Sequence, residues 1–167
     1  RRRAAPARTG PLKAQPVLGS RQFWKPTAEE NPFNAWSHRC SLVSARPDSR
    51  LLDGLTVAVK DNISVGGLPT TLGTFSSLFS DDGTYPLSEI DSIVVSRILR
   101  AGAEIKGTST CESFCASPLS FTSATGPVHN PLLHGYTAGG SSSGSSALVA
   151  AHALARGRDG SWGSTAQ

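Results

Sequence analysis

The sequence predicts an α/β fold in which helices cover a central sheet. The prediction rests on three successive segments. Residues 55–59 (LTVAV) are a short apolar and β-branched run after the turn at Asp53-Gly54, which is typical of a buried strand. Residues 92–101 repeat apolar side chains at helical spacing, and residues 104–107 (EIKG) are expected to form a second short strand. Strand, helix and strand in this order indicate a sheet with helices packed against it.

The central helix has a start signal and a stop signal in the sequence. Asp91 is the predicted N-cap, and Gly102 follows the last helical residue. The expected buried stripe consists of Ile90, Val94, Ile98 and Ala101, widened by Val95 and Leu99.

The other segments are assigned from composition. Residues 31–36 (NPFNAW) indicate a turn followed by aromatic side chains that can pack. Residues 64–86 and 116–138 are rich in Gly, Ser, Thr and Pro, so we expect two long loops. Residues 147–155 are expected to form a second helix.

The positive charge is concentrated at the beginning of the chain. The net charge is +4, but residues 1–28 hold seven basic residues and no acidic one, so the rest is slightly acidic. We expect residues 1–28 to be disordered; an organelle transit peptide is the alternative. A nucleic-acid-binding domain would carry its basic patch on the folded part, so we expect no nucleic-acid partner.

Three cysteines are present, and Cys111 and Cys115 are four positions apart. Without further His or Cys at metal-site spacing, buried free thiols are favoured over a zinc site. No apolar run approaches the ~20 residues that span a bilayer, so a cytoplasmic protein without a membrane partner is expected. The chain begins with Arg1 and contains no Met, from which we expect a fragment or a processed product.

The stretch at residues 139–146 (GGSSSGSS) is the strongest functional signal. It leads directly into the apolar run at residues 147–151. A Gly/Ser loop at a helix start allows close backbone approach and can bind an anion or a developing negative charge. A flexible linker is the alternative. A phosphate-binding P-loop is poorly supported, because no lysine follows the glycines as in Gly-Lys-Ser/Thr.

Lys60 ends the first predicted strand. A lysine at such a position either extends to solvent or is held in a dry site and acts as a base. A neutral lysine beside a serine of the Gly/Ser run would make a nucleophile-activating pair.

Together these segments resemble the amidase signature family. The matching motifs are GLTVAVKDNI at residues 54–63, GLPTT at 67–71, DSIVVSRILRAG at 91–102, ESF at 112–114, TGPVHNP at 125–131 and TAGGSSSGS at 137–145. The resemblance runs from about residue 31 to residue 151 and is greatest to fungal amidases. It implies a mixed central sheet flanked by helices, incomplete in this chain.

The resemblance also implies a Ser-Ser-Lys triad that hydrolyses an amide C–N bond of a small molecule through an acyl-enzyme. Lys60 matches the base, and Ser141 matches the bridging serine that a cis peptide bond holds. Gly139, Gly140 and Ser142 match positions beside the substrate, and Ser142 is expected to help hydrogen-bond the triad. No metal or organic cofactor is implied.

The nucleophile is less well matched. The family places it in a Gly-x-Asp-x-Gly-Gly-Ser motif, which residues 157–164 fit only with gaps, so Ser164 is the candidate. Trp162 would replace a glycine that supplies backbone N–H donors.

Three parts of the chain are therefore distinguished: a basic tail at 1–28, the first part of an amidase domain at 29–151, and a divergent tail at 152–167. In one alternative the divergent tail is non-native and has no catalytic role. The chain alone is expected to be poorly stable and inactive, because a partial sheet exposes edges and apolar faces.

The other functional alternatives are a catalytically inactive remnant or interaction module, and a component of an amidotransferase that works on mischarged tRNA.

Overall fold

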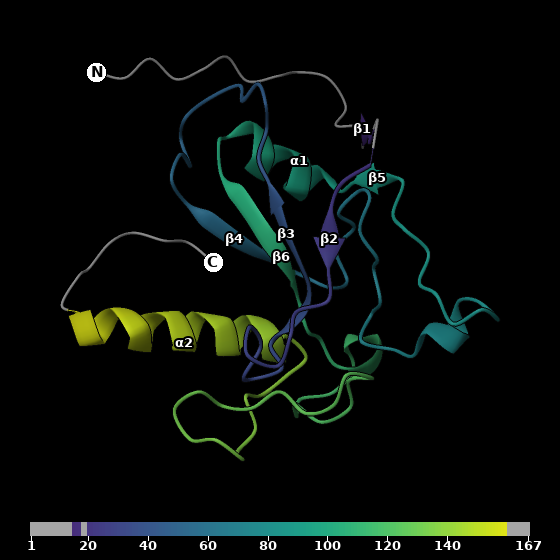
Figure 1. Cartoon of the computed structure of the whole chain (residues 1–167), viewed down its shortest axis with the longest axis vertical. Helices are drawn as coiled ribbons and strands as arrows, with labels where there is room; N and C mark the ends of the chain where they lie inside the picture. Colours follow the sequence, from purple (N-terminus) through teal and green to yellow (C-terminus); the bar gives the residue numbers. More distant parts are fainter. Residues whose placement is uncertain (1–14, 18–19, 160–167) are drawn as a thin grey trace.

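The computed structural model describes residues 15–17 and 20–159. Its main feature is a four-stranded sheet with the order β2-β3-β6-β4 (Figure 1). The strands are β2 (Phe23–Trp24), β3 (Trp36–Leu42), β4 (Thr56–Lys60) and β6 (Glu104–Ser109). β4 and β6 are parallel, whereas β2, β3 and β6 are antiparallel neighbours. The sheet is mixed, which confirms the predicted fold class.

The parallel pair determines where the chemistry lies. β4 and β6 correspond to the two predicted strands, although β6 continues to Ser109, two residues further than predicted. Their register places Thr56 opposite Glu104 and Lys60 opposite Ser109. The carboxyl ends of both strands therefore lie at the same edge of the sheet.

The connection from β4 to β6 contains η1 (Ser76–Leu78), β5 (Ile90–Asp91) and α1 (Ile93–Arg100). The N-cap of α1 is Ser92, whose hydroxyl accepts a hydrogen bond from the Val95 N–H at 3.4 Å. The predicted cap, Asp91, is wrong. Its carboxylate instead accepts two hydrogen bonds from the Arg21 guanidinium, at 2.6 and 2.8 Å, and one from the Gly66 N–H.

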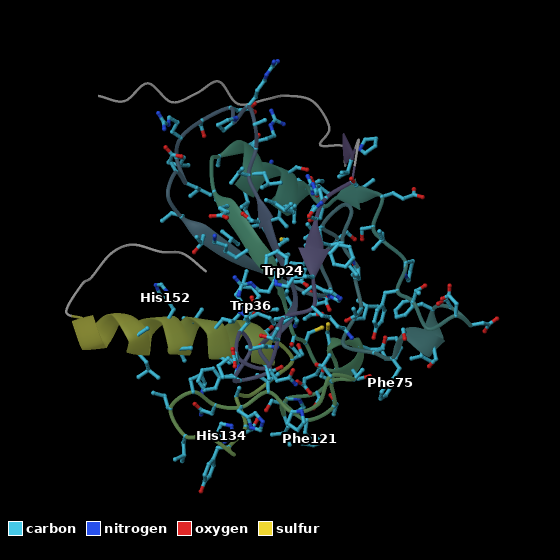
Figure 2. All side chains as sticks on the ribbon, viewed as in Figure 1. Trp24, Trp36, Phe75, Phe121, His134 and His152 are labelled. Carbon is cyan, nitrogen blue, oxygen red and sulfur yellow. The ribbon has the colours of Figure 1, made fainter. Side chains whose placement is uncertain are left out.

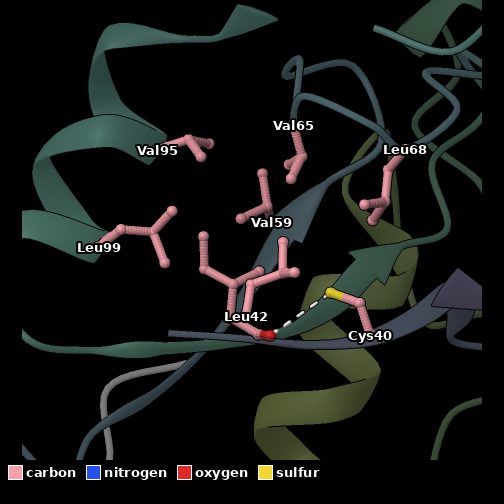
Figure 3. Packing of buried hydrophobic residues seen from close by; sticks show 8 residues of the cluster. Cys40, Leu42, Val59, Val65, Leu68, Val95 and Leu99 are labelled. Atoms are coloured by element: carbon pink, nitrogen blue, oxygen red, sulfur yellow. Dashed lines mark hydrogen bonds between the residues drawn. The ribbon is translucent and has the colours of Figure 1, made fainter. Parts of the chain in front are cut away.

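The buried face of α1 also differs from the predicted stripe. Val95 and Leu99 are buried, whereas Val94 is exposed. The side chains that were expected only to widen the stripe are therefore its centre. They pack on the sheet in a core that consists of Cys40, Leu42, Val59, Val65, Leu68, Val95, Leu99 and Ile105 (Figure 3). In this core the Cys40 thiol donates a hydrogen bond to the Ile105 carbonyl, at 3.4 Å.

The region before residue 29 is partly ordered, which corrects the prediction of disorder for the described residues there. Phe23 pairs with Cys40 across the sheet and packs against the core. The Arg39 guanidinium lies over the rings of both Trp24 and Trp36, 5.9 and 4.7 Å from their centroids. Figure 2 labels these two tryptophans, which lie near one another. The burial of Phe23 and the contact of Arg39 with Trp24 offset the conformational entropy that residues 23–24 lose when they join the sheet. β1 (Gln15–Pro16) pairs with β5, and the prediction for residues 1–14 lies outside the described residues.

The second helix, α2, runs from Ser143 to Asp159. It begins inside the Gly/Ser run, four residues before the predicted start, and it continues past residue 155. Figure 1 shows it below β4, and it contacts both β4 and β6. A second, smaller core of Ala35, Val128 and Ala147 packs around its first turns. No helix in the described part of the chain is long and apolar enough to cross a membrane.

η2 (Ser113–Cys115) and the long loop after it complete the described structure. The three cysteines carry free thiols; Cys40 and Cys111 are buried and Cys115 is half-buried.

Candidate active site

The candidate site is centred on a lysine–serine contact at the carboxyl edge of the parallel strands. Lys60 is the last residue of β4, and its side chain is half-buried. Its Nζ donates a hydrogen bond of 2.9 Å to Oγ of Ser141, a residue 81 positions away in the sequence. The two predicted residues are therefore in direct contact, and Lys60 does not extend freely into solvent.

Ser141 lies at the entrance to α2, and the peptide bond between Gly140 and Ser141 is cis. Gly140 allows the chain to approach its neighbours closely at this point. A Cβ on Gly140 would lie 2.5 Å from the Ser117 carbonyl oxygen and 3.0 Å from Cγ of Glu112. The position therefore requires glycine because of space.

The Gly/Ser run is bound along its length to the segment that follows β6. The Ser141 carbonyl accepts a hydrogen bond from the Glu112 N–H at 3.2 Å, and the Gly144 N–H donates to the Thr110 carbonyl at 2.9 Å. The hydroxyls of Ser145 and Ser109 are 2.7 Å apart. These bonds exclude the flexible-linker alternative for residues 141–145.

The remaining predicted residues differ in what surrounds them. Gly139 has a positive φ of 80°, and its N–H donates to the Thr137 hydroxyl. Within the described residues, the Ser142 hydroxyl makes no hydrogen bond, although its carbonyl accepts one from the Ser146 N–H. The predicted role of Ser142 in hydrogen-bonding the triad thus remains a prediction. Ser164 lies outside the described residues.

Sequence reasoning missed one buried carboxyl group beside the contact. Glu112 is fully buried, and its Oε1 accepts a hydrogen bond of 2.7 Å from the Ser143 hydroxyl. Its Oε2 accepts two hydrogen bonds from Thr122, one from the N–H and one from the hydroxyl, each at 2.7 Å. The only signal in the sequence was its place in the ESF motif.

A second buried acidic group, Asp61, follows Lys60 directly. Its carboxyl group accepts hydrogen bonds from the hydroxyls of Ser37, at 2.6 Å, and Thr71. Burial raises the pKa of Asp61 to about 6, although these hydrogen bonds act in the opposite direction. The Ser37 hydroxyl also lies 3.1 Å from Nδ1 of His38. Burial, together with the charge of Lys25, lowers the pKa of His38 to about 4.

Ser37, His38, Asp61 and Thr71 line a small cavity of about 20 Å³. This volume holds about one water molecule. Among the described residues, no cluster of three or more His, Cys, Asp or Glu side chains is arranged to hold a metal ion.

Fold and site together define an α/β protein with a lysine amine and a serine hydroxyl paired at the carboxyl edge of its parallel strands, an arrangement that can activate a hydroxyl group. The model of the Amidase family matches residues 23–161, and the chain belongs to this family.

Three similar proteins illustrate the relationship. The chain is 43% identical over 140 residues to an enantioselective amidase of Rhodococcus rhodochrous, covering 83% of this chain and 26% of that enzyme. The crystal structure of a glutamyl-tRNA(Gln) amidotransferase subunit from Thermotoga maritima superposes with a TM-score of 0.60 at 30% identity, covering 71% of this chain and 25% of that one. Allophanate hydrolase of Kluyveromyces lactis superposes with a TM-score of 0.60 at 27% identity, covering 75% of this chain and 20% of that one. The chain thus spans about a quarter of the length of the enantioselective amidase.

Proposed function

We propose that the protein hydrolyses the C–N bond of a small-molecule amide, with Lys60 and Ser141 as two members of a Ser-Ser-Lys triad. The contact of 2.9 Å between Lys60 Nζ and Ser141 Oγ carries this proposal. Membership in the amidase family supports the reaction class.

In the proposed mechanism Lys60 acts as an uncharged amine, which turns its lone pair toward Ser141 across the same 2.9 Å contact and accepts the proton of the hydroxyl. Ser141 in turn accepts the proton of a second serine, whose Oγ attacks the amide carbonyl. The nitrogen of the substrate takes up the proton that Lys60 holds, passed back through Ser141, and leaves as the amine, and an acyl ester remains on the second serine. Attack of water on this ester releases the acid and restores both hydroxyls.

Ser164 is our candidate for the second serine, from its place in the sequence motif. Gly139, Gly140 and Ser142 are proposed to contact the substrate. An exposed Gly140 and a Ser142 hydroxyl that makes no hydrogen bond to any other described residue support this assignment.

The test compares variants of the full-length protein that carries this sequence, assayed for release of ammonia or amine from a panel of aliphatic and aromatic amides. Lys60→Met and Ser141→Ala are expected to lower kcat/KM by about 10³-fold or more, as removal of triad members does in other serine hydrolases. Ser164→Ala is expected to do the same.

Three control variants match these substitutions. Lys106→Met removes a lysine on the adjacent strand β6, and Ser146→Ala removes an exposed serine of the same Gly/Ser run. Ser161→Ala removes a serine that precedes Ser164 in the sequence of the tail. All three should retain activity. Full activity of Lys60→Met would refute the proposal. Full activity of Ser164→Ala alone would refute only the assignment of the nucleophile.

A second candidate function is that of an amidotransferase component, which the similarity to the Thermotoga maritima protein favours. Such a protein would release ammonia from an amide donor efficiently only with tRNA and its partner subunits. Turnover of simple amides by the isolated protein at the same rate with and without added partners would favour the amidase. An absence of turnover in both conditions would favour an inactive remnant.

The free thiols support placing the protein in the reducing cytoplasm.

A further inference from the structure

We infer that Glu112 is a positioning residue that holds Ser141 against Lys60; this inference rests on the proposed function. Glu112 follows the end of β6 and touches the Gly/Ser run in two ways. Its main-chain N–H donates to the carbonyl of Ser141, and its side chain accepts from the hydroxyl of Ser143, the first residue of α2. One residue therefore binds the chain on both sides of Ser142.

The environment of Glu112 makes this attachment rigid. The side chain is 0% exposed, and a buried carboxyl group is stable only when its oxygens are hydrogen-bonded. Three donors meet this need: the Ser143 hydroxyl on one oxygen, and the N–H and hydroxyl of Thr122 on the other. The Thr122 hydroxyl is itself fixed, because it accepts a hydrogen bond from the Ser113 N–H.

The carboxyl group thus connects three segments that meet at the edge of the sheet: the end of β6, the loop around Thr122 and the start of α2. A Cβ on Gly140 would lie 3.0 Å from Cγ of the same side chain. The Lys60–Ser141 distance consequently depends on a support made by Glu112, which contacts neither the lysine amine nor the serine hydroxyl by a hydrogen bond of its own.

Glu112→Gln is the sharpest perturbation, since it preserves shape but offers one acceptor oxygen in place of two. Both donors of Thr122 point at the same oxygen of residue 112, Oε2. The main-chain N–H of Thr122 can only donate, so an acceptor must remain at this position. The glutamine oxygen must therefore face Thr122, and its NH₂ must face Ser143, whose hydroxyl then loses its acceptor. The contact to the loop survives, whereas the contact to the start of α2 is altered.

Kinetic measurements on the full-length protein give the first readout. We expect Glu112→Gln to lower kcat by about tenfold or more with little change in KM, because misplacement of a catalytic group by ~1 Å costs on the order of 100-fold. The matched control is Glu104→Gln, the same substitution at the opposite end of β6, where the side chain pairs with Lys106. Its kcat should stay at the wild-type value.

Lysine labelling gives a second readout that needs no turnover. Trace acylation by acetic anhydride, followed by peptide mass spectrometry, measures the reactivity of each amine. Glu112→Gln should increase the labelling of Lys60 and leave that of Lys106 unchanged. Glu104→Gln should do the reverse, since it removes the negative charge with which Lys106 pairs. A general loosening of the fold would increase both.

Ser143→Ala covers the case in which Glu112→Gln does not fold, because it removes the same contact from the side of α2. It should also lower kcat and expose Lys60. Wild-type kcat and wild-type Lys60 labelling in both variants would overturn the inference. If the wild-type protein hydrolyses no amide, the proposed function fails, and the labelling pattern alone then decides whether Glu112 positions Ser141.

Discussion

The buried pair His38 and Asp61 gives a prediction about how stability depends on pH. Asp61 is 1% exposed and His38 is 5% exposed. Burial raises the pKa of Asp61 from 3.8 to about 6 and lowers that of His38 from 6.5 to about 4. Both shifts disfavour the charged form in the folded state, and they cover nearly the same pH range.

The two groups affect stability with opposite signs. Between pH 4 and 6 the folded protein keeps a proton on Asp61 that the unfolded chain releases, so this group makes the free energy of unfolding fall as pH rises. Between pH 6.5 and 4 the unfolded chain protonates His38 and the folded protein does not, so this group makes the free energy of unfolding fall as pH falls. Each shift of about two units corresponds to roughly 3 kcal/mol, and the two contributions nearly cancel in the wild type.

Single substitutions should reveal each contribution. On acidification from pH 6.5 to 4, Asp61→Asn should lose roughly 3 kcal/mol of stability relative to wild type, and His38→Gln should gain a similar amount. Urea unfolding followed by tryptophan fluorescence at constant ionic strength measures both, and comparison with wild type removes the contribution of other carboxylates. The double variant should follow the wild-type pH dependence. If His38→Gln and wild type show parallel curves, the two groups do not titrate as their burial requires.

Two further predictions concern packing and thiol reactivity. Gly144→Ala should destabilise the protein by about 2 kcal/mol, although alanine favours helices, because its Cβ would lie 2.5 Å from the main-chain nitrogen of Thr110. The control is Ser146→Ala at an exposed position of the same helix. It should change the free energy of unfolding by less than ~0.5 kcal/mol in the same urea experiment. Iodoacetamide at pH 8 should alkylate the half-buried Cys115 first, and mass spectrometry should find Cys40 and Cys111 unmodified until urea is added. The reason is that burial raises the pKa of Cys40 to about 11 and also raises the pKa of Cys111, which keeps both thiols protonated. Equal alkylation rates at all three thiols in the native protein would contradict this burial.

The strands β4 and β6 and the helix α1 could be predicted because their apolar patterns are local properties of the sequence. β3 could not, since Ser37, His38 and Arg39 interrupt its apolar pattern. Ser37 and His38 are nevertheless buried, because they bond to one another and Ser37 bonds to Asp61. A strand whose polar residues are satisfied by tertiary partners has no periodic signal in the sequence.

The same distinction explains the errors at the start of α1 and near the beginning of the chain. Asp91 and Ser92 are both good N-cap residues. Only the folded structure brings Arg21 and the Gly66 N–H to the Asp91 carboxylate, which leaves the cap to Ser92. Phe23 is ordered for a similar reason, because the strand with which it pairs lies further along the chain.

For the candidate site, the sequence by itself determined which residue types stand at the end of a strand and at the start of a helix, and the resemblance of its motifs named Lys60 and Ser141. Only the tertiary structure decided that these two residues touch across 81 positions of sequence. It also brought Glu112 into hydrogen bonds with Ser141 and Ser143, because the hydrogen bonds of a buried carboxyl group depend on which segments fold around it.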